Sequence, residues 1–194
     1  MTKPIILLIA FSIVLCQSSF SQNGYKQFRW GMKANKVSSL VPDIEFQQNK
    51  STTFFSIAFL CKYGTAIDGT IPDPLNEVYD RIDLYQSQES DMDFFFIDSS
   101  LFAVAINQIA SGDNSFSLAL DRKYGYSTAH GMIIGSAEFQ VKAWYNSGDR
   151  IITFGRNVDY ESVTYLNKAI FLKLAGPISK QLKKQNQKQK GRLD

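Results

Sequence analysis

The chain has 194 residues, 44% of them hydrophobic and 20% charged, which suits one globular domain and excludes a disordered chain. One histidine and two cysteines are too few to build a zinc or iron site. The net charge of +3 is unevenly spread: residues 22–179 carry 14 basic and 17 acidic residues, whereas residues 180–194 carry six basic and one acidic residue. The basic character therefore belongs to the tail.

Residues 1–21 have the layout of a secretory signal peptide. Lys3 precedes an apolar run from Pro4 to Cys16, and Ser19-Phe20-Ser21 places small residues before Gln22. The apolar run is shorter than the roughly twenty residues that a membrane-spanning helix needs. We expect an exported chain, periplasmic or associated with the outer envelope of a bacterium.

Cys16 offers an alternative to cleavage before Gln22. Ile13-Val14-Leu15-Cys16 is similar to the segment in which bacterial lipoproteins carry their acylated cysteine, although Leu15 stands where a small residue is usual. Removal of Cys16 would leave Cys61 alone, so no internal disulfide could form. Because Cys61 ends an apolar run, we interpret it as a buried, inert thiol.

The first half of the chain predicts alternating short elements. Tyr25–Gly31 reads as an entry strand and 33–40 as a short helix, stopped by Pro42. Phe54–Tyr63 is uniformly apolar, which favours a buried strand, although its length also permits a helix. After a loop at 69–74, the alternation of Val78–Gln86 predicts a half-solvated strand.

The second half predicts two hairpins and further helices. Strands at 92–97 and 101–109 flank Asp98-Ser99-Ser100, and a helix capped by Asn114 or Ser115 ends at Gly125. Residues 128–135 read as a loop. Strands at 137–145 and 150–154 flank a turn at 146–149, and a further strand is expected at 162–166. Two helical pieces follow, at 169–175 and 178–185, separated by Gly176-Pro177.

These elements predict an α+β fold in one domain. Strands joined by short turns imply an antiparallel sheet of about five to seven strands, with two or three helices packed mainly on one face. The expected organisation is a signal peptide at 1–21, the domain at 22–179 and a basic, disordered tail at 180–194.

No set of residues in the sequence forms a recognisable catalytic, cofactor or metal site. Cys61 and His130 are the one thiol–imidazole pair left after export, and nothing in the sequence brings them together. Asp91-Met92-Asp93 lacks the spacing of a calcium loop and reads as a solvated turn. The sequence shows no pair of carboxylates of the kind a glycosidase uses. Asp80 and Asp83 would face opposite sides of a strand. Asp121, Asp149 and Asp159 fit helix or turn positions. We assign no catalytic, cofactor-binding or metal-binding residues and expect no cofactor.

The tail is the clearest charge pattern. Its basic residues are Lys180, Lys183, Lys184, Lys188, Lys190 and Arg192. We interpret it as a solubilising terminus, with contact to anionic lipid headgroups as the alternative. Aromatic residues are absent between the lysines, which argues against nucleic acid as a partner.

Phe28-Arg29-Trp30-Gly31-Met32 resembles the opening of a group of small exported bacterial proteins of unknown function whose mature chains begin with F-x-W-G-M and a helix. Leu120-Asp121-Arg122-Lys123-Tyr124-Gly125 and Trp144-Tyr145 fit the same pattern. The opening is more faintly similar to SmpA/OmlA-type outer-membrane lipoproteins. Neither resemblance implies an active site.

The sequence therefore favours a non-catalytic envelope protein that binds an unknown ligand or an envelope protein partner. Two alternatives stay open. One is a periplasmic hydrolase whose carboxylates are assembled by the fold, and the other is a lipid-anchored envelope assembly factor.

Overall fold

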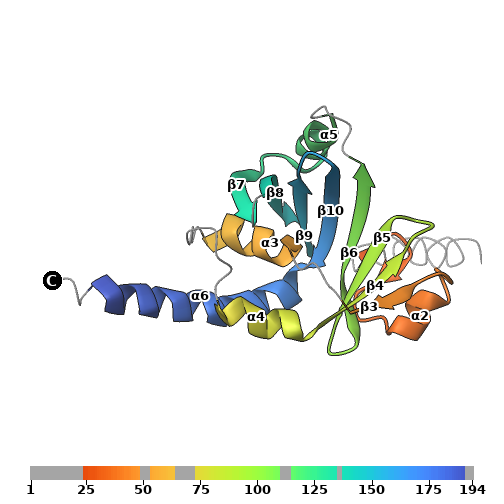
Figure 1. Ribbon diagram of the computed structural model, residues 1–194, viewed down its shortest axis with the longest axis horizontal. Helices are drawn as coiled ribbons and strands as arrows, with labels where there is room; N and C mark the ends of the chain where they lie inside the picture. The colour runs from red at the N-terminus through yellow and green to blue at the C-terminus, as the bar shows by residue number, and fades with distance from the viewer. Residues whose placement is uncertain (1–23, 49–52, 64–72, 110–114, 135–136, 191–194) are drawn as a thin grey trace, which may run out of the picture.

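The computed structural model describes residues 24–48, 53–63, 73–109, 115–134 and 137–190. An antiparallel sheet in the order β3-β4-β5-β6-β10-β9-β8-β7 forms its centre (Figure 1). The strands are β3 (Glu45–Gln47), β4 (Ile82–Ser87), β5 (Met92–Ile97), β6 (Ser100–Ile109), β7 (Thr128–Ile134), β8 (Ala137–Ser147), β9 (Arg150–Arg156) and β10 (Tyr160–Asn167). The predicted α+β class with an antiparallel sheet is confirmed, with seven main strands and the three-residue edge strand β3.

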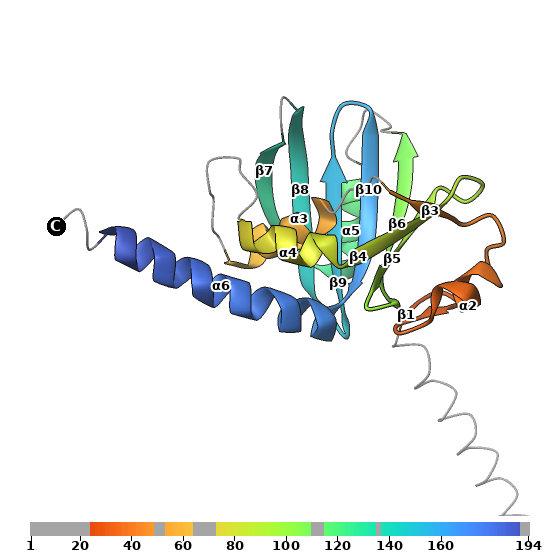
Figure 2. The same cartoon turned by 60° about the horizontal axis from the view of Figure 1, so that its bottom comes forward.

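Three helices cover one face of the sheet (Figure 2). They are α3 (Thr53–Tyr63), α4 (Asp73–Asp80) and α6 (Lys168–Lys190). The opposite face carries the hairpin of β1 (Gly24–Tyr25) and β2 (Phe28–Arg29) together with α2 (Ala34–Ser38) and α5 (Ser115–Tyr124). Consecutive residues of the central strands serve opposite faces: Phe95 packs toward α3, whereas Phe94 and Phe96 pack toward the N-terminal hairpin and α2.

The favoured strand at Phe54–Tyr63 is wrong, because this segment forms α3. The helix is buried on several sides: Phe55 and Phe59 join the core shared with α4 and α6, whereas Ile57 and Cys61 join β8. A helix covered all round has no polar stripe, so its sequence shows no helical period. Gly155 on β9 lets α3 approach closely, since a Cβ there would lie 3.0 Å from Ile57 Cδ1.

Several other boundaries differ from the sequence prediction. Residues 128–134, expected as a loop, form the edge strand β7, and 73–80 form α4 before β4 begins at Ile82. The link between β5 and β6 has two residues rather than three, because Asp98 and Ser99 both have positive φ (50° and 59°), as a type I′ turn requires. The helix α6 passes through Pro177 and reaches Lys190, so much of the tail expected to be disordered is helical.

The Phe28–Met32 motif at the start of the domain docks onto the sheet. The Gly31 N–H donates to the Leu101 carbonyl and the Leu101 N–H donates to the Met32 carbonyl, both at 2.8 Å. Gly31 has a φ of 86°, which favours glycine. Trp30 and Met32 pack against the core beneath. The predicted helix end at Gly125 is also present, since its N–H donates to the Asp121 carbonyl at a φ of 81°.

Phe55→Ala tests whether α3 ties the helical layer to the sheet. Phe55 is fully buried between the rings of Tyr79 and Phe171. We expect the substitution to lower the free energy of unfolding by about 3–5 kcal/mol, measured by urea denaturation. Leu118→Ala on the exposed side of α5 is the control and should cost less than about 1 kcal/mol. Equal losses in both variants would refute the central position of α3.

Candidate functional site

A cavity of about 260 Å³ lies on the α3 face of the sheet, toward the end where β9 turns into β10. Helix α3 contributes Phe54 and Ile57 to its wall, and the strands contribute Phe95, Ala105 and Phe139. Hydroxyl groups are interspersed with these apolar side chains, from Thr153 on β9 and from Ser162 and Thr164 on β10. The cavity is thus mainly apolar, with a polar strip along β9 and β10.

Asp93 supplies a carboxylate to this cavity. Its Oδ1 accepts a hydrogen bond from Gln86 Nε2 and its Oδ2 accepts one from Asn107 Nδ2, both at 2.9 Å. Burial raises the pKa of Asp93, and the two amide hydrogen bonds only partly oppose that shift. An ionised carboxylate has about four acceptor positions, so the two amides leave room for a further donor.

The cross-strand register explains why these three polar side chains meet. Gln86 on β4 lies opposite Asp93, and Asp93 lies opposite Ala105, two residues before Asn107 on β6. Residues two apart share a face, so Gln86, Asp93 and Asn107 all project on the side of Leu84, Phe95 and Ala105. Asp93 therefore sits in a fixed amide clamp at the rim of the apolar face.

Glu161 borders the cavity, but its side chain belongs to the other face of the sheet. It alternates with Ser162 and shares the face of Val163, which packs in the core with α5. Its Oε1 accepts a hydrogen bond from Gln108, which is its cross-strand neighbour, and its Oε2 is buried without a hydrogen-bond partner. Among the described residues, Asp93 is thus the one carboxylate whose side chain faces this cavity.

The aspartates that the sequence analysis considered have other surroundings. Asp121 on α5 accepts hydrogen bonds from Lys142 Nζ at 2.5 Å and Ser127 Oγ at 3.1 Å. Burial tends to raise the pKa of Asp121, yet these hydrogen bonds outweigh it and leave the pKa lowered. Asp80 ends α4 and Asp83 lies on β4, Asp159 is exposed in the β9–β10 turn, and Asp149 pairs with Arg150 at 3.4 Å.

Cys61 fits the interpretation of an inert thiol. Its side chain is buried on α3, its Sγ lies 3.8 Å from the Thr128 carbonyl, and burial raises its pKa to about 12. His130 lies on β7, two residues beyond Thr128, and its side chain is outside the described residues. Across the described parts of the chain, no three His, Cys, Asp or Glu side chains gather as a metal site would require.

A second, more open hollow of about 370 Å³ lies at the opposite end of the sheet, where β10 leads into α6. It is lined by Trp30 of the opening motif and by Asp149, Asn167 and Lys168. Trp30 Nε1 and Asp149 Oδ2 are buried there without a hydrogen-bond partner. Asn167 Oδ1 accepts the Ile170 N–H and Lys168 Nζ donates to the Tyr145 carbonyl, so the remaining polar groups serve the fold.

The sequence predicts Asp93 at the start of a strand at 92–97, beside a solvated turn, but it does not indicate Gln86 and Asn107 as partners of Asp93. Asp91 does lie in the turn, with a φ of 49°, whereas Asp93 is already inside β5. The available signal was the alternation Met92-Asp93-Phe94-Phe95, which places a carboxylate on the same face as Phe95. A charged residue on a buried face of a strand deserves examination as a site.

The chain matches no protein-family model, and neither a curated protein nor a solved structure matches it. Its functional interpretation therefore rests on the geometry of the Asp93 cavity.

The pH dependence of stability tests the burial of Asp93. Because the pKa of Asp93 is raised above its usual 3.8, the folded protein holds this proton more tightly than the unfolded chain does. Ionisation of Asp93 thus costs stability as the pH rises from about 4 through the raised pKa. The quantity to measure is the free energy of unfolding of wild type minus that of Asp93→Asn, obtained by urea denaturation at each pH. We expect this difference to fall as the pH rises from about 4 through the raised pKa of Asp93.

Other carboxylates do not obscure this difference. The pKa values of Asp43 and Asp121 are lowered, that of Asp43 mainly by the hydrogen bond from Ser87, so these two carboxylates raise the stability as the pH rises. They do so in wild type and in Asp93→Asn alike, and their contributions cancel when the two free energies are subtracted. A difference that stays flat or rises with pH would show that Asp93 is not buried as described.

Proposed function

We propose that the protein is a non-catalytic exported binding module, and that the cavity beside Asp93 holds its ligand. The observation that carries this proposal is the carboxylate itself, which is clamped by two amides at the rim of an apolar cavity and retains unused acceptor positions. Small-molecule sites are typically apolar concavities with a few fixed polar groups, and this cavity has that composition.

The size and charge of the cavity indicate the class of ligand. At about 260 Å³ it is smaller than the usual range for drug-sized ligands, but a dry cavity of about 150 Å³ in another protein accepts benzene. The ligand is therefore compact, about one ring in size. It carries an ammonium or another hydrogen-bond donor, because only a donor satisfies the Asp93 carboxylate.

Exposed apolar side chains near the cavity support a binding role. Tyr160, which lines the cavity, is 63% exposed, and its cross-strand neighbour Ile109 is 80% exposed. Val158 in the adjoining turn is 92% exposed. An apolar rim of this kind adds contact area for the ligand as it enters.

The hydrolase alternative gains no comparable support. A glycosidase needs two carboxyl groups about 5–10 Å apart on either side of one bond. Among the described residues, Asp93 faces the cavity whereas the neighbouring Glu161 carboxylate lies on the other face of the sheet. The lipid-anchored alternative depends on Cys16, which lies outside the described residues.

A charge series of single-ring compounds tests this function. Benzylamine, benzyl alcohol and benzoate differ in one group only, and we expect benzylamine to bind at least about fivefold more tightly than benzyl alcohol, with benzoate weakest. Isothermal titration calorimetry or ligand-observed NMR at pH 7 supplies the dissociation constants. Equal affinity for all three compounds, or no binding of any, would reject the proposed ligand class.

Single substitutions test whether these compounds bind in the Asp93 cavity. Asp93→Asn should abolish the preference for benzylamine, whereas Asp159→Asn, which removes an exposed carboxylate from the β9–β10 turn, should retain it. Ser162→Leu fills the cavity from β10 and should abolish binding of all three compounds without loss of the folded state. Binding that survives Ser162→Leu would place the site elsewhere.

A further inference from the structure

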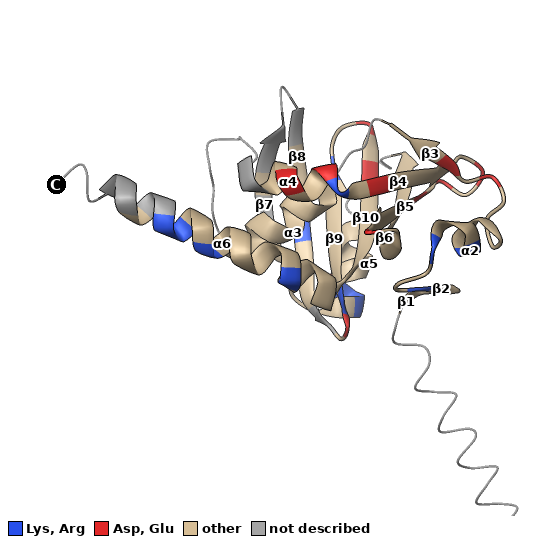
Figure 3. Cartoon of the chain, turned by 90° about the horizontal axis from the view of Figure 1, so that it is seen from below, with Lys and Arg blue, Asp and Glu red and all other residues tan. Residues whose placement is uncertain are grey.

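The charged side chains are separated between the two ends of the strands. At the end that holds the Asp93 cavity, the turns β4–β5 and β9–β10, the edge strand β3 and the segment just before it carry the carboxylates Asp43, Glu45, Glu89, Asp91 and Asp159. Most red segments of Figure 3 lie toward the upper part of that view, although one lies in the turn below β9, and most blue segments follow α6, α2 and β2 below. The protein thus has an acidic end and a basic side.

Helix α6 supplies the longest part of the basic side. Phe171, Ala175, Ile178 and Leu182 pack on the body of the protein. Lys173, Lys180, Lys183 and Lys184 are exposed and recur on the opposite face of the helix. None of the helices within the described residues has the length and apolarity to cross a membrane. Because its apolar face packs on the body and its lysines face solvent, α6 is suited to lie along a negatively charged surface.

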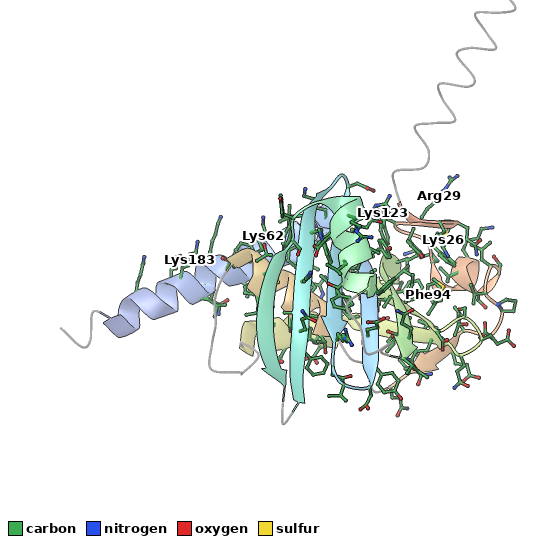
Figure 4. The ribbon with its side chains drawn as sticks, turned by 90° about the horizontal axis from the view of Figure 1, so that it is seen from above. Lys26, Arg29, Lys62, Phe94, Lys123 and Lys183 are labelled. Carbon is green, nitrogen blue, oxygen red and sulfur yellow. The ribbon has the colours of Figure 1, made fainter. Side chains whose placement is uncertain are left out.

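Three other elements add cations on the same side (Figure 4). Lys62 ends α3, Lys123 lies in the last turn of α5, and Lys26 and Arg29 belong to the β1–β2 hairpin; with Lys183 they follow the upper side of that view. Three carboxylates near these cations are paired: Asp98 pairs with Arg81 at 2.7 Å, and Asp121 and Asp149 pair as described above.

Tyrosine rings accompany these lysines. Lys62 Nζ lies 4.9 Å from the ring centroid of Tyr145, Lys123 Nζ 5.1 Å from that of Tyr124, and Lys26 Nζ 5.4 Å from that of Tyr25. Tyr126, which directly follows the end of α5, is fully exposed. Tyr126 is of the kind found at a membrane–water interface, since it has an apolar body and a polar tip, whereas Tyr25 is buried in the core and the Tyr145 hydroxyl donates to the Ala58 carbonyl.

We infer that this basic side binds the surface of an anionic lipid bilayer. In that orientation the lysine face of α6 lies on the headgroups, while the opening of the Asp93 cavity points away from the membrane. This inference does not depend on a ligand in the cavity, so either proposal can fail without the other.

Vesicle binding of the exported chain, residues 22–194, tests the inference. The probe is vesicles with 30% phosphatidylglycerol in phosphatidylcholine, compared with phosphatidylcholine alone, by co-sedimentation in 0.1 M salt. Each lysine near an anionic surface contributes roughly fivefold in partition coefficient. The triple variant Lys180→Gln, Lys183→Gln, Lys184→Gln should therefore bind the anionic vesicles on the order of 100-fold less tightly.

A matched variant separates position from net charge. Gln48→Glu, Gln88→Glu and Gln140→Glu together lower the net charge by the same three units at exposed positions away from the basic side. This variant should bind within about threefold of wild type. Equal weakening in both variants, or equal wild-type binding to neutral and anionic vesicles, would overturn the inference. Circular dichroism of each variant confirms that α6 stays helical.

Discussion

The structure depends on a sheet that is apolar on both faces and must therefore be covered on both. The central strands alternate large residues between the two sides: Phe94 and Phe96 face one layer, and Phe95 and Ile97 face the other. An antiparallel sheet with one solvated face would show a polar residue at every second position. Here both layers are needed, and the short N-terminal hairpin and α2 contribute the buried side chains Tyr25, Phe28 and Val37 to the second one.

The cavity follows from how the helical layer covers its face. Helix α3 lies across β7, β8 and β9, and Gly155 allows the close approach of Ile57. The strands β5, β6 and β10 continue beyond the first turn of α3. The sheet face left there is still apolar near Phe95 and Ala105 but already carries Asp93 and Asn107. Desolvation of Asp93 is thus a consequence of the same packing that closes the core.

The sequence predicts elements whose side chains alternate between environments. The β8–β9 hairpin and the helix before Gly125 were predictable, because turn residues and polar–apolar alternation mark them. Phe54–Tyr63 was not, since a helix buried all round lacks the polar stripe that distinguishes it from a strand. The continuation of α6 through Pro177 was missed because Gly176-Pro177 reads locally as a stop, whereas Ile178 and Leu182 still have a core to bury against.

The candidate site could not be predicted from any one segment of the sequence, because its residues come from different strands. Asp93, Gln86 and Asn107 come from three strands, and only the register of the folded sheet brings them together. The same holds for the basic side, where Lys62, Lys123 and the lysines of α6 come from elements far apart in the sequence. Composition located the basic charge in the tail but gave no indication that the body of the protein continues it.

The central claim is that Asp93 is a desolvated carboxylate that a ligand donor neutralises. Its most direct test is an NMR titration of the Asp93 side-chain carbon against pH, with and without saturating benzylamine. A cation that binds the ionised form must lower the pKa of Asp93, because binding then favours loss of the proton. We expect a raised pKa in the free protein that falls when benzylamine is present. A pKa near 3.8 in the free protein, or one that benzylamine leaves unchanged, would contradict the account.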